Sequence, residues 1–160
     1  MNRYKSILAT MLAVLSLLSF NSCSDKESDE PTDTPAAKSV AGTYKGDMTC
    51  SVMGQESVFE DMTFTVTASD DATVSVGISS FGNPPMQVPE ITVPDVKVAG
   101  SDGTYSLAST KFEGELSNGK TYSGTLDGSY ASDQITIRFN LQYGSMPMPM
   151  ICSFTSPKQK

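Results

Sequence analysis

Apolar and polar residues alternate one by one along most of the chain after residue 42, and this period of two is the feature that most constrains its fold. The clearest example runs from Ile135 to Tyr143, where every second residue is apolar and those between are polar. Such alternation is typical of a β-strand with one face buried and one face in water. No helical periodicity is present after residue 39, so the sequence predicts an all-β fold.

Short turns separate the alternating segments and indicate how the strands pair. Asp102-Gly103 and Asn118-Gly119 supply residues that tolerate a positive φ in hairpin turns. Because no connection is long enough for a crossover helix, each strand should pair antiparallel with the next. We expect strands near 42–52, 57–67, 74–78, 91–98, 105–116, 122–130, 135–143 and 148–156. An eight-stranded antiparallel up-and-down barrel would bury their apolar faces and leave no open edge.

The segment 80–90 does not fit a central strand. Prolines occupy four positions between 84 and 94, and each proline removes a backbone donor from a sheet. We therefore interpret 80–90 as a loop over one mouth of the barrel and 91–98 as the fourth strand. The apolar residues Phe81, Met86 and Val88 of this loop would either cap the core or contact a ligand.

The N-terminus has the features of an export signal. A basic start precedes an apolar run over 7–20, and Cys23 follows closely. As a helix this run would span about 21 Å, whereas crossing a bilayer takes about 30 Å. Residues 1–22 resemble a bacterial lipoprotein signal, and the resemblance implies that the signal is removed and Cys23 is lipidated. The alternative is an ordinary secretory signal that is cut elsewhere.

An acidic segment follows Cys23. Residues 23–38 contain five acidic and two basic residues and almost nothing apolar, so we expect a flexible tether. The stretch 24–30 also resembles the acidic tag of surface-exposed lipoproteins in some Gram-negative anaerobes. Together these resemblances imply an outer membrane lipoprotein, exposed at the cell surface and anchored to the membrane by its lipid. The remainder, 39–160, has the size of one domain.

Charge and composition exclude several function classes. The domain carries 7 basic and 13 acidic residues, and this net charge of −6 argues against nucleic-acid binding. The chain has no histidine, which excludes Ser-His-Asp and Cys-His catalysis. Glu113 and Glu115 would share the outer face of a strand, because Phe112 and Leu116 claim the inner face. We interpret them as a solvated pair rather than a glycosidase pair, and we expect no enzyme activity and no cofactor.

Cys50 and Cys152 are the only cysteines besides Cys23. Disulfides persist in exported proteins, and these two residues lie on the inward parity of the first and last strands. If the barrel closes, those strands pair and the two sulfurs can form a disulfide. The alternative is two free buried thiols that pack as small apolar side chains. Two thiols without histidine make an incomplete zinc site, so we expect no metal there.

The run Met146-Pro147-Met148-Pro149-Met150 is unusual. Three thioethers at this spacing could bind Cu(I). In an extended segment the same three side chains would project to one face, into the barrel, where methionine fills irregular space. We favour core packing, because the alternation already explains the spacing.

The start of the first strand carries a short family resemblance. The sequence Val-Ala-Gly-Thr-Tyr at 40–44 resembles the Gly-x-Trp start of lipocalins and other calycins, with Tyr44 at the tryptophan position. The Thr-Tyr-x-Gly pattern of 43–46 recurs at 121–124. Together with the signal, the chain resembles the calycin-like β-barrel lipoproteins of Gram-negative anaerobes over about 39–156. The resemblance implies an eight-stranded up-and-down barrel and no established activity.

Two functions are compatible with these features. The first is a binding module that holds a small apolar or amphipathic ligand, or a glycan fragment, inside the barrel or at its mouth. The second is a non-enzymatic structural or protein-interaction module, with a packed barrel, that contacts another envelope protein. A barrel of eight strands has room for little more than its own side chains. An interior pocket smaller than about 300 Å³ would therefore argue against an interior ligand.

Overall fold

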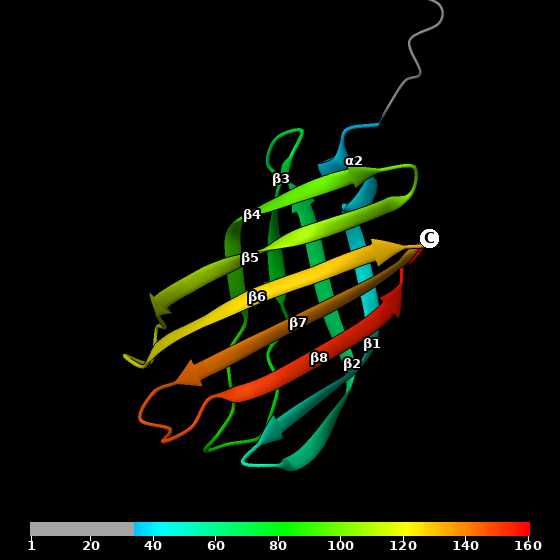
Figure 1. The fold of residues 1–160 in the computed structure, drawn as a ribbon. Coiled ribbons are helices and arrows are strands. Elements are labelled where there is room, and N and C mark those ends of the chain that lie inside the picture. Colours follow the sequence, from blue (N-terminus) through cyan, green and yellow to red (C-terminus); the bar gives the residue numbers. More distant parts are fainter. Residues whose placement is uncertain (1–33) are drawn as a thin grey trace, which may run out of the picture. The chain divides into compact units, whose positions relative to one another are not determined.

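The computed structural model describes residues 34–160, and over this range it shows one short helix followed by eight strands (Figure 1). The elements are α2 (Ala36–Val40), β1 (Gly42–Val52), β2 (Gln55–Ala68), β3 (Thr73–Ile78), β4 (Ile91–Ser101), β5 (Thr104–Glu115), β6 (Thr121–Ala131), β7 (Gln134–Tyr143) and β8 (Met150–Pro157). Each strand pairs antiparallel with the next, and β8 pairs with β1 to close the barrel. The predicted eight-stranded antiparallel up-and-down barrel is confirmed.

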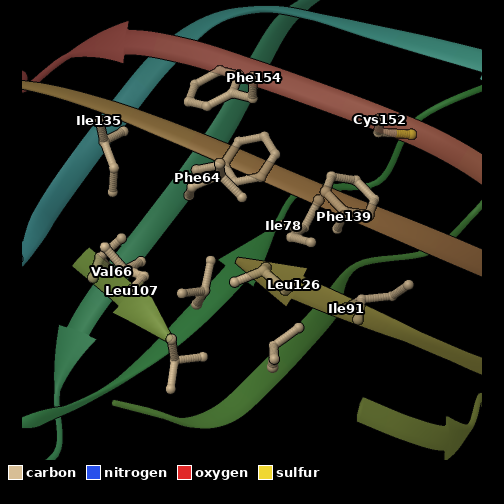
Figure 2. Close-up of a cluster of buried hydrophobic side chains, with 14 of the residues drawn as sticks. Phe64, Val66, Ile78, Ile91, Leu107, Leu126, Ile135, Phe139, Cys152 and Phe154 are labelled. Atoms are coloured by element: carbon tan, nitrogen blue, oxygen red, sulfur yellow. The ribbon is translucent and has the colours of Figure 1, made fainter. Parts of the chain in front are cut away.

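One parity of each strand points inward and builds a single apolar core. At its centre the ring of Phe64 stacks on that of Phe154, with 4.0 Å between centroids, and Phe139 lies 6.3 Å from Phe64 (Figure 2). Every strand contributes a buried side chain: Tyr44, Phe64, Val76, Val96, Leu107, Leu126, Ile137 and Phe154. Burying one such aliphatic or phenyl side chain contributes about 1.5–3 kcal/mol, so this core dominates the favourable side of folding.

The strands contain bulges where the apolar parity slips in the sequence. In β4 the inward parity passes from Val93 to Val96, and the register with β3 shifts at this point. Pro94 and Asp95 form the bulge between these two valines, and Asp95 adopts a φ of 58°. A proline is tolerated there because a bulge leaves a residue unpaired. The slip within β5 likewise coincides with a register shift, in that case against β6.

The two ends of the barrel differ. We call the end that carries α2 the helix end, and its connections are 69–72, 102–103 and 132–133. We call the opposite end the mouth end, and its connections are 53–54, 79–90, 116–120 and 144–149. The longest loops therefore lie at the mouth end, and the tip of the β1–β2 hairpin projects from this end (Figure 1).

The helix α2 covers the core at the helix end. Its residues Ala37 and Val40 are buried, and Tyr44 Oη donates a hydrogen bond of 2.6 Å to the carbonyl of Val40. The helix begins inside the segment 23–38, which the composition assigns to the tether, so the ordered part of the domain starts earlier than predicted. Five residues are too few to show a helical period in a sequence. The predicted signal peptide and Cys23 lie outside the described residues.

A disulfide joins the first strand to the last. Cys50 of β1 and Cys152 of β8 are direct partners in the ladder, with 2.05 Å between the sulfurs and 4.0 Å between the Cα atoms. Both side chains are buried. The predicted disulfide is therefore confirmed, and the alternative of two free thiols is excluded.

The disulfide should contribute strongly to stability, because its partners are separated by 102 residues. Replacing Cys50 and Cys152 together by alanine should lower the free energy of unfolding by about 4–5 kcal/mol in the chain-entropy model. Guanidinium denaturation measures this difference. The reduced wild-type protein is the control and should lose a similar amount. A loss below about 1 kcal/mol in both would show that the β1–β8 ladder closes the barrel without the bond.

Candidate functional site

The interior of the barrel is filled by its own side chains. Five hollows of about 360 to 590 Å³ lie on the described residues, at the barrel ends or along the outer surface. None of them is lined by Phe64, Leu126 or Phe154, which occupy the centre of the core (Figure 2). None of these five hollows is therefore an interior site for a small ligand.

The loop 79–90 contains two kinds of apolar residue. Phe81 and Val88 exchange backbone hydrogen bonds of 3.0 and 2.8 Å, and both side chains are buried. The ring of Phe81 packs against Phe59 of β2 in a T-shaped pair, with 5.2 Å between centroids. Met86, at the tip of the loop, is exposed instead. Phe81 and Val88 therefore cap the core, and Met86 is the one of the three that presents most of its side chain to other molecules.

One hollow at the mouth end, of about 510 Å³, combines apolar lining with a single cation. Met86 and Met146 contribute thioether side chains from two different loops, and Lys120 contributes the charge. Lys120 Nζ lies 5.2 Å from the centre of the Tyr143 ring, within the range of a cation–π contact. Asn118 Nδ2 donates a hydrogen bond of 3.2 Å to the hydroxyl of the same tyrosine. The hollow suits an amphipathic molecule with a negative group.

The large apolar side chains that are exposed on the described residues all lie at the mouth end. They are Met53 (78% exposed), Val58 (60%), Met86 (55%), Met148 (46%) and Ile151 (64%). Two come from the β1–β2 hairpin, two from loops, and one from the start of β8. Scattered apolar residues are normal on a surface, but these five all lie at the same end of the barrel. Of the five, the sequence pattern placed Met86 in the mouth loop and made Met148 a candidate for Cu(I) binding or core packing, and it singled out none of the other three.

The prediction that Met146, Met148 and Met150 all point into the barrel is wrong at Met148. The alternation places Met146, Met148 and Met150 on one inward face, but β8 begins only at Met150. Met150 is buried, Met146 packs at the edge of the core, and Met148 is exposed. The prolines on either side of Met148 cannot donate to a ladder, so the extended geometry does not continue through them. The three side chains therefore do not all project into the barrel.

Two tyrosines at the helix end, Tyr44 and Tyr130, have raised pKa values. Tyr130 Oη donates a hydrogen bond of 2.9 Å to Asp133 Oδ1, and burial followed by this bond raises the pKa of Tyr130 to about 12. Burial likewise raises the pKa of Tyr44. Both keep their protons at neutral pH and cannot serve as bases.

The glutamate pair of β5, Glu113 and Glu115, is exposed. Within 34–160 no group of three or more His, Cys, Asp or Glu residues is placed to hold a metal ion.

Comparison with known proteins agrees with this fold. A family model for the calycin-like β-barrel domain matches residues 40–156. The chain is similar to a Bacteroides fragilis protein of known crystal structure, provisionally described as an outer membrane protein, with 25% identity and a TM-score of 0.67. The match covers 78% of this chain and 53% of that protein, so the chain spans about half its length. No curated protein matches. None of the helices within 34–160 has the length and apolarity to cross a bilayer.

The buried tyrosines should make the protein less stable at high pH. An unfolded tyrosine loses its proton near pH 10, whereas Tyr130 keeps its proton to about pH 12 in the fold. Between these values the unfolded state binds fewer protons, so the free energy of unfolding should fall as pH rises. Urea denaturation across this interval should show the fall, and Tyr130→Phe should reduce its slope. Tyr122→Phe controls for loss of a hydroxyl; an unchanged slope in Tyr130→Phe would contradict the assignment.

Proposed function

The chain belongs to the calycin-like β-barrel family, and on this basis we propose that it is a non-enzymatic, lipid-anchored module of the cell envelope that binds another envelope protein. In this proposal the packed barrel is a rigid scaffold, and the mouth end makes the contact.

Three features support the envelope location. The N-terminal sequence has the order of an export signal followed by Cys23. The disulfide between Cys50 and Cys152 is typical of proteins in an oxidising compartment. The similar Bacteroides fragilis protein is provisionally described as an outer membrane protein. A lipid on Cys23 would anchor the protein, and the acidic stretch 24–30 would direct it to the cell surface.

The position of the exposed apolar side chains is the main support for the proposed interaction role. All five lie at the mouth end of the described residues, whereas the apolar side chains that point into the barrel are buried. Removing such side chains from water gives about 25 cal/mol for each Å² buried, and a partner protein could cover several of them at once.

A second candidate is the binding of a small amphipathic molecule or a glycan fragment at the mouth end. The hollow beside Met86, Lys120 and Tyr143 favours it, because a volume of about 510 Å³ falls in the range of small-molecule sites. In that case the lysine would pair with a negative group, and the methionines would contact the apolar part of the ligand.

The proposed lipid anchor predicts that Cys23 is the residue that carries the lipid. Cys23→Ser should carry no lipid after metabolic labelling with a fatty-acid analogue, because the thiol is the acyl attachment point. The variant should also remain uncleaved or leave the membrane fraction. The double variant of Cys50 and Cys152 to alanine is the matched control and should keep its label. Equal labelling of Cys23→Ser and the wild-type protein would contradict the lipid anchor.

The mouth-end contact can be tested by comparing the two ends of the barrel in living cells. A photo-crosslinking residue at Met148 should give a defined adduct with an envelope protein, whereas one at Gln134, exposed at the helix end, should give none. Met53→Ser with Met86→Ser should reduce the adduct and leave the melting temperature nearly unchanged, because exposed side chains contribute little to the fold.

Two results would go against the interaction role. Equal adducts from Met148 and Gln134 would show that the contact is not confined to the mouth end. Saturable binding of an amphipathic molecule that Lys120→Ala abolishes, without any protein adduct from Met148, would favour the small-ligand candidate instead.

A further inference from the structure

The strand β2 has neighbours on both sides over only part of its length. From Phe64 to Val66 it pairs with both β1 and β3, and Thr67 and Ala68 pair with β3 alone. The N–H of Ser79 still reaches the carbonyl of Thr63 at 3.0 Å. Over 55–59, however, β2 pairs with β1 alone, and Glu60 and Asp61 have no partner in the β1 register. No other segment of the described chain pairs with the outer edge of 55–61. The outward N–H and C=O groups of this stretch are therefore available to an added strand.

A groove of about 360 Å³ lies beside this free edge. Its lining comes from residues 58–62 of β2 and from residues 80–83 of the loop that follows β3. The half-buried ring of Phe59, which packs on the buried ring of Phe81, is the aromatic part of the groove. An extended segment in this groove could bond to the backbone of β2 and place an apolar side chain against Phe59.

The β4–β5 ladder also opens toward the mouth end, but its edge is less suitable. The two strands pair only from Val98 to Ser101 of β4. Beyond that point Pro94 has no N–H to donate, and proline is a feature that protects natural strand edges. No residue of β4 lines any of the five hollows. The β2 edge, in contrast, combines open backbone groups with a groove.

The charge of the β2 edge selects between possible partners. Glu56, Glu60 and Asp61 are exposed, and residues 53–63 contain no lysine or arginine. Two copies of this edge would bring carboxylates face to face, and the whole chain carries a net charge of −7. Pairing between two copies is therefore disfavoured. A strand with basic side chains would instead form opposite-charge pairs across the ladder, each worth about 0.2–1 kcal/mol.

We propose that the free edge of β2 over 55–61 binds an extended basic segment of a partner polypeptide as an added β-strand. This rests on the proposed function and identifies the part of the partner that is recognised. Glu56, Val58 and Glu60 lie on one parity of β2, and Phe59 lies on the other. A segment that alternates basic and apolar residues matches this order, with basic groups beside the glutamates and apolar groups over the groove.

A short synthetic peptide of alternating lysine and valine is the probe. Its affinity for the full-length protein in detergent can be measured by fluorescence anisotropy. The same peptide with alternate backbone amides N-methylated keeps its charge but loses donors, and it should bind at least about tenfold more weakly. Hydrogen exchange of the bound protein should show new amide protection within 55–61.

Charge reversal separates this edge from general attraction to an acidic protein. Glu56→Lys with Glu60→Lys should weaken binding of the lysine–valine peptide by about tenfold or more. Glu113→Lys with Glu115→Lys makes the same change in net charge on exposed positions of β5, and it should weaken binding by less than about threefold. All four side chains are exposed, so both variants should keep the melting temperature of the wild-type protein.

Several results would overturn the proposal. They are equal binding of the N-methylated peptide, equal weakening by the two charge reversals, new protection at β5 rather than at 55–61, and dimerisation of the protein through 55–61. Each of these leaves the Met148 crosslink in cells unaffected. Failure of the strand-addition proposal can therefore be distinguished from failure of the proposed interaction role.

Discussion

The pairing of β1 with β8 is the constraint on which the rest of the structure depends. Without it, an eight-stranded sheet would expose two edges and one side of its core. Four residue pairs of the two strands form the ladder, and the Cys50–Cys152 disulfide lies within it. Toward the helix end, Ser156 Oγ donates a hydrogen bond of 2.5 Å to the carbonyl of Lys45. Backbone hydrogen bonds, a side-chain hydrogen bond and a disulfide thus all join β1 to the C-terminal strand β8.

The closure of the barrel determines which parts of the molecule can contact other molecules. Eight strands enclose little more than the side chains that point inward, and here Phe64, Phe139 and Phe154 occupy the centre. At the helix end, α2 covers the core and Tyr44 bonds to Val40. The mouth end carries the longest loops, the exposed apolar side chains and the free stretch of β2. The features that favour contact with other molecules therefore concentrate at the end opposite α2.

Bulges explain how a closed barrel can still have a free edge. The β1–β2 register shifts between Gly46 and Met48, and Asp61 adopts a φ of 56° at the corresponding place in β2. A bulge bends its strand and increases the local twist. Beyond this point β2 continues with β1 as a two-stranded arm, and β3 has already ended at Ile78. The barrel is closed around its core, while the arm retains a strand edge that the core does not need.

The sequence by itself determined the strands and their antiparallel order, because alternation, turn residues and strand parity are local signals. It placed Cys50 and Cys152 on the inward parity of the first and last strands, and closure of the barrel decided that they form a disulfide. Only the tertiary structure decided which loop residues are buried: Phe81 is covered by Phe59, whereas Met86 is left exposed. Alternation failed at Met148, where the flanking prolines interrupt the strand. The exposed apolar residues gather at one end because the closed barrel brings β1, β2 and β8 together, and burial and edge pairing depend on contacts between residues far apart in the chain.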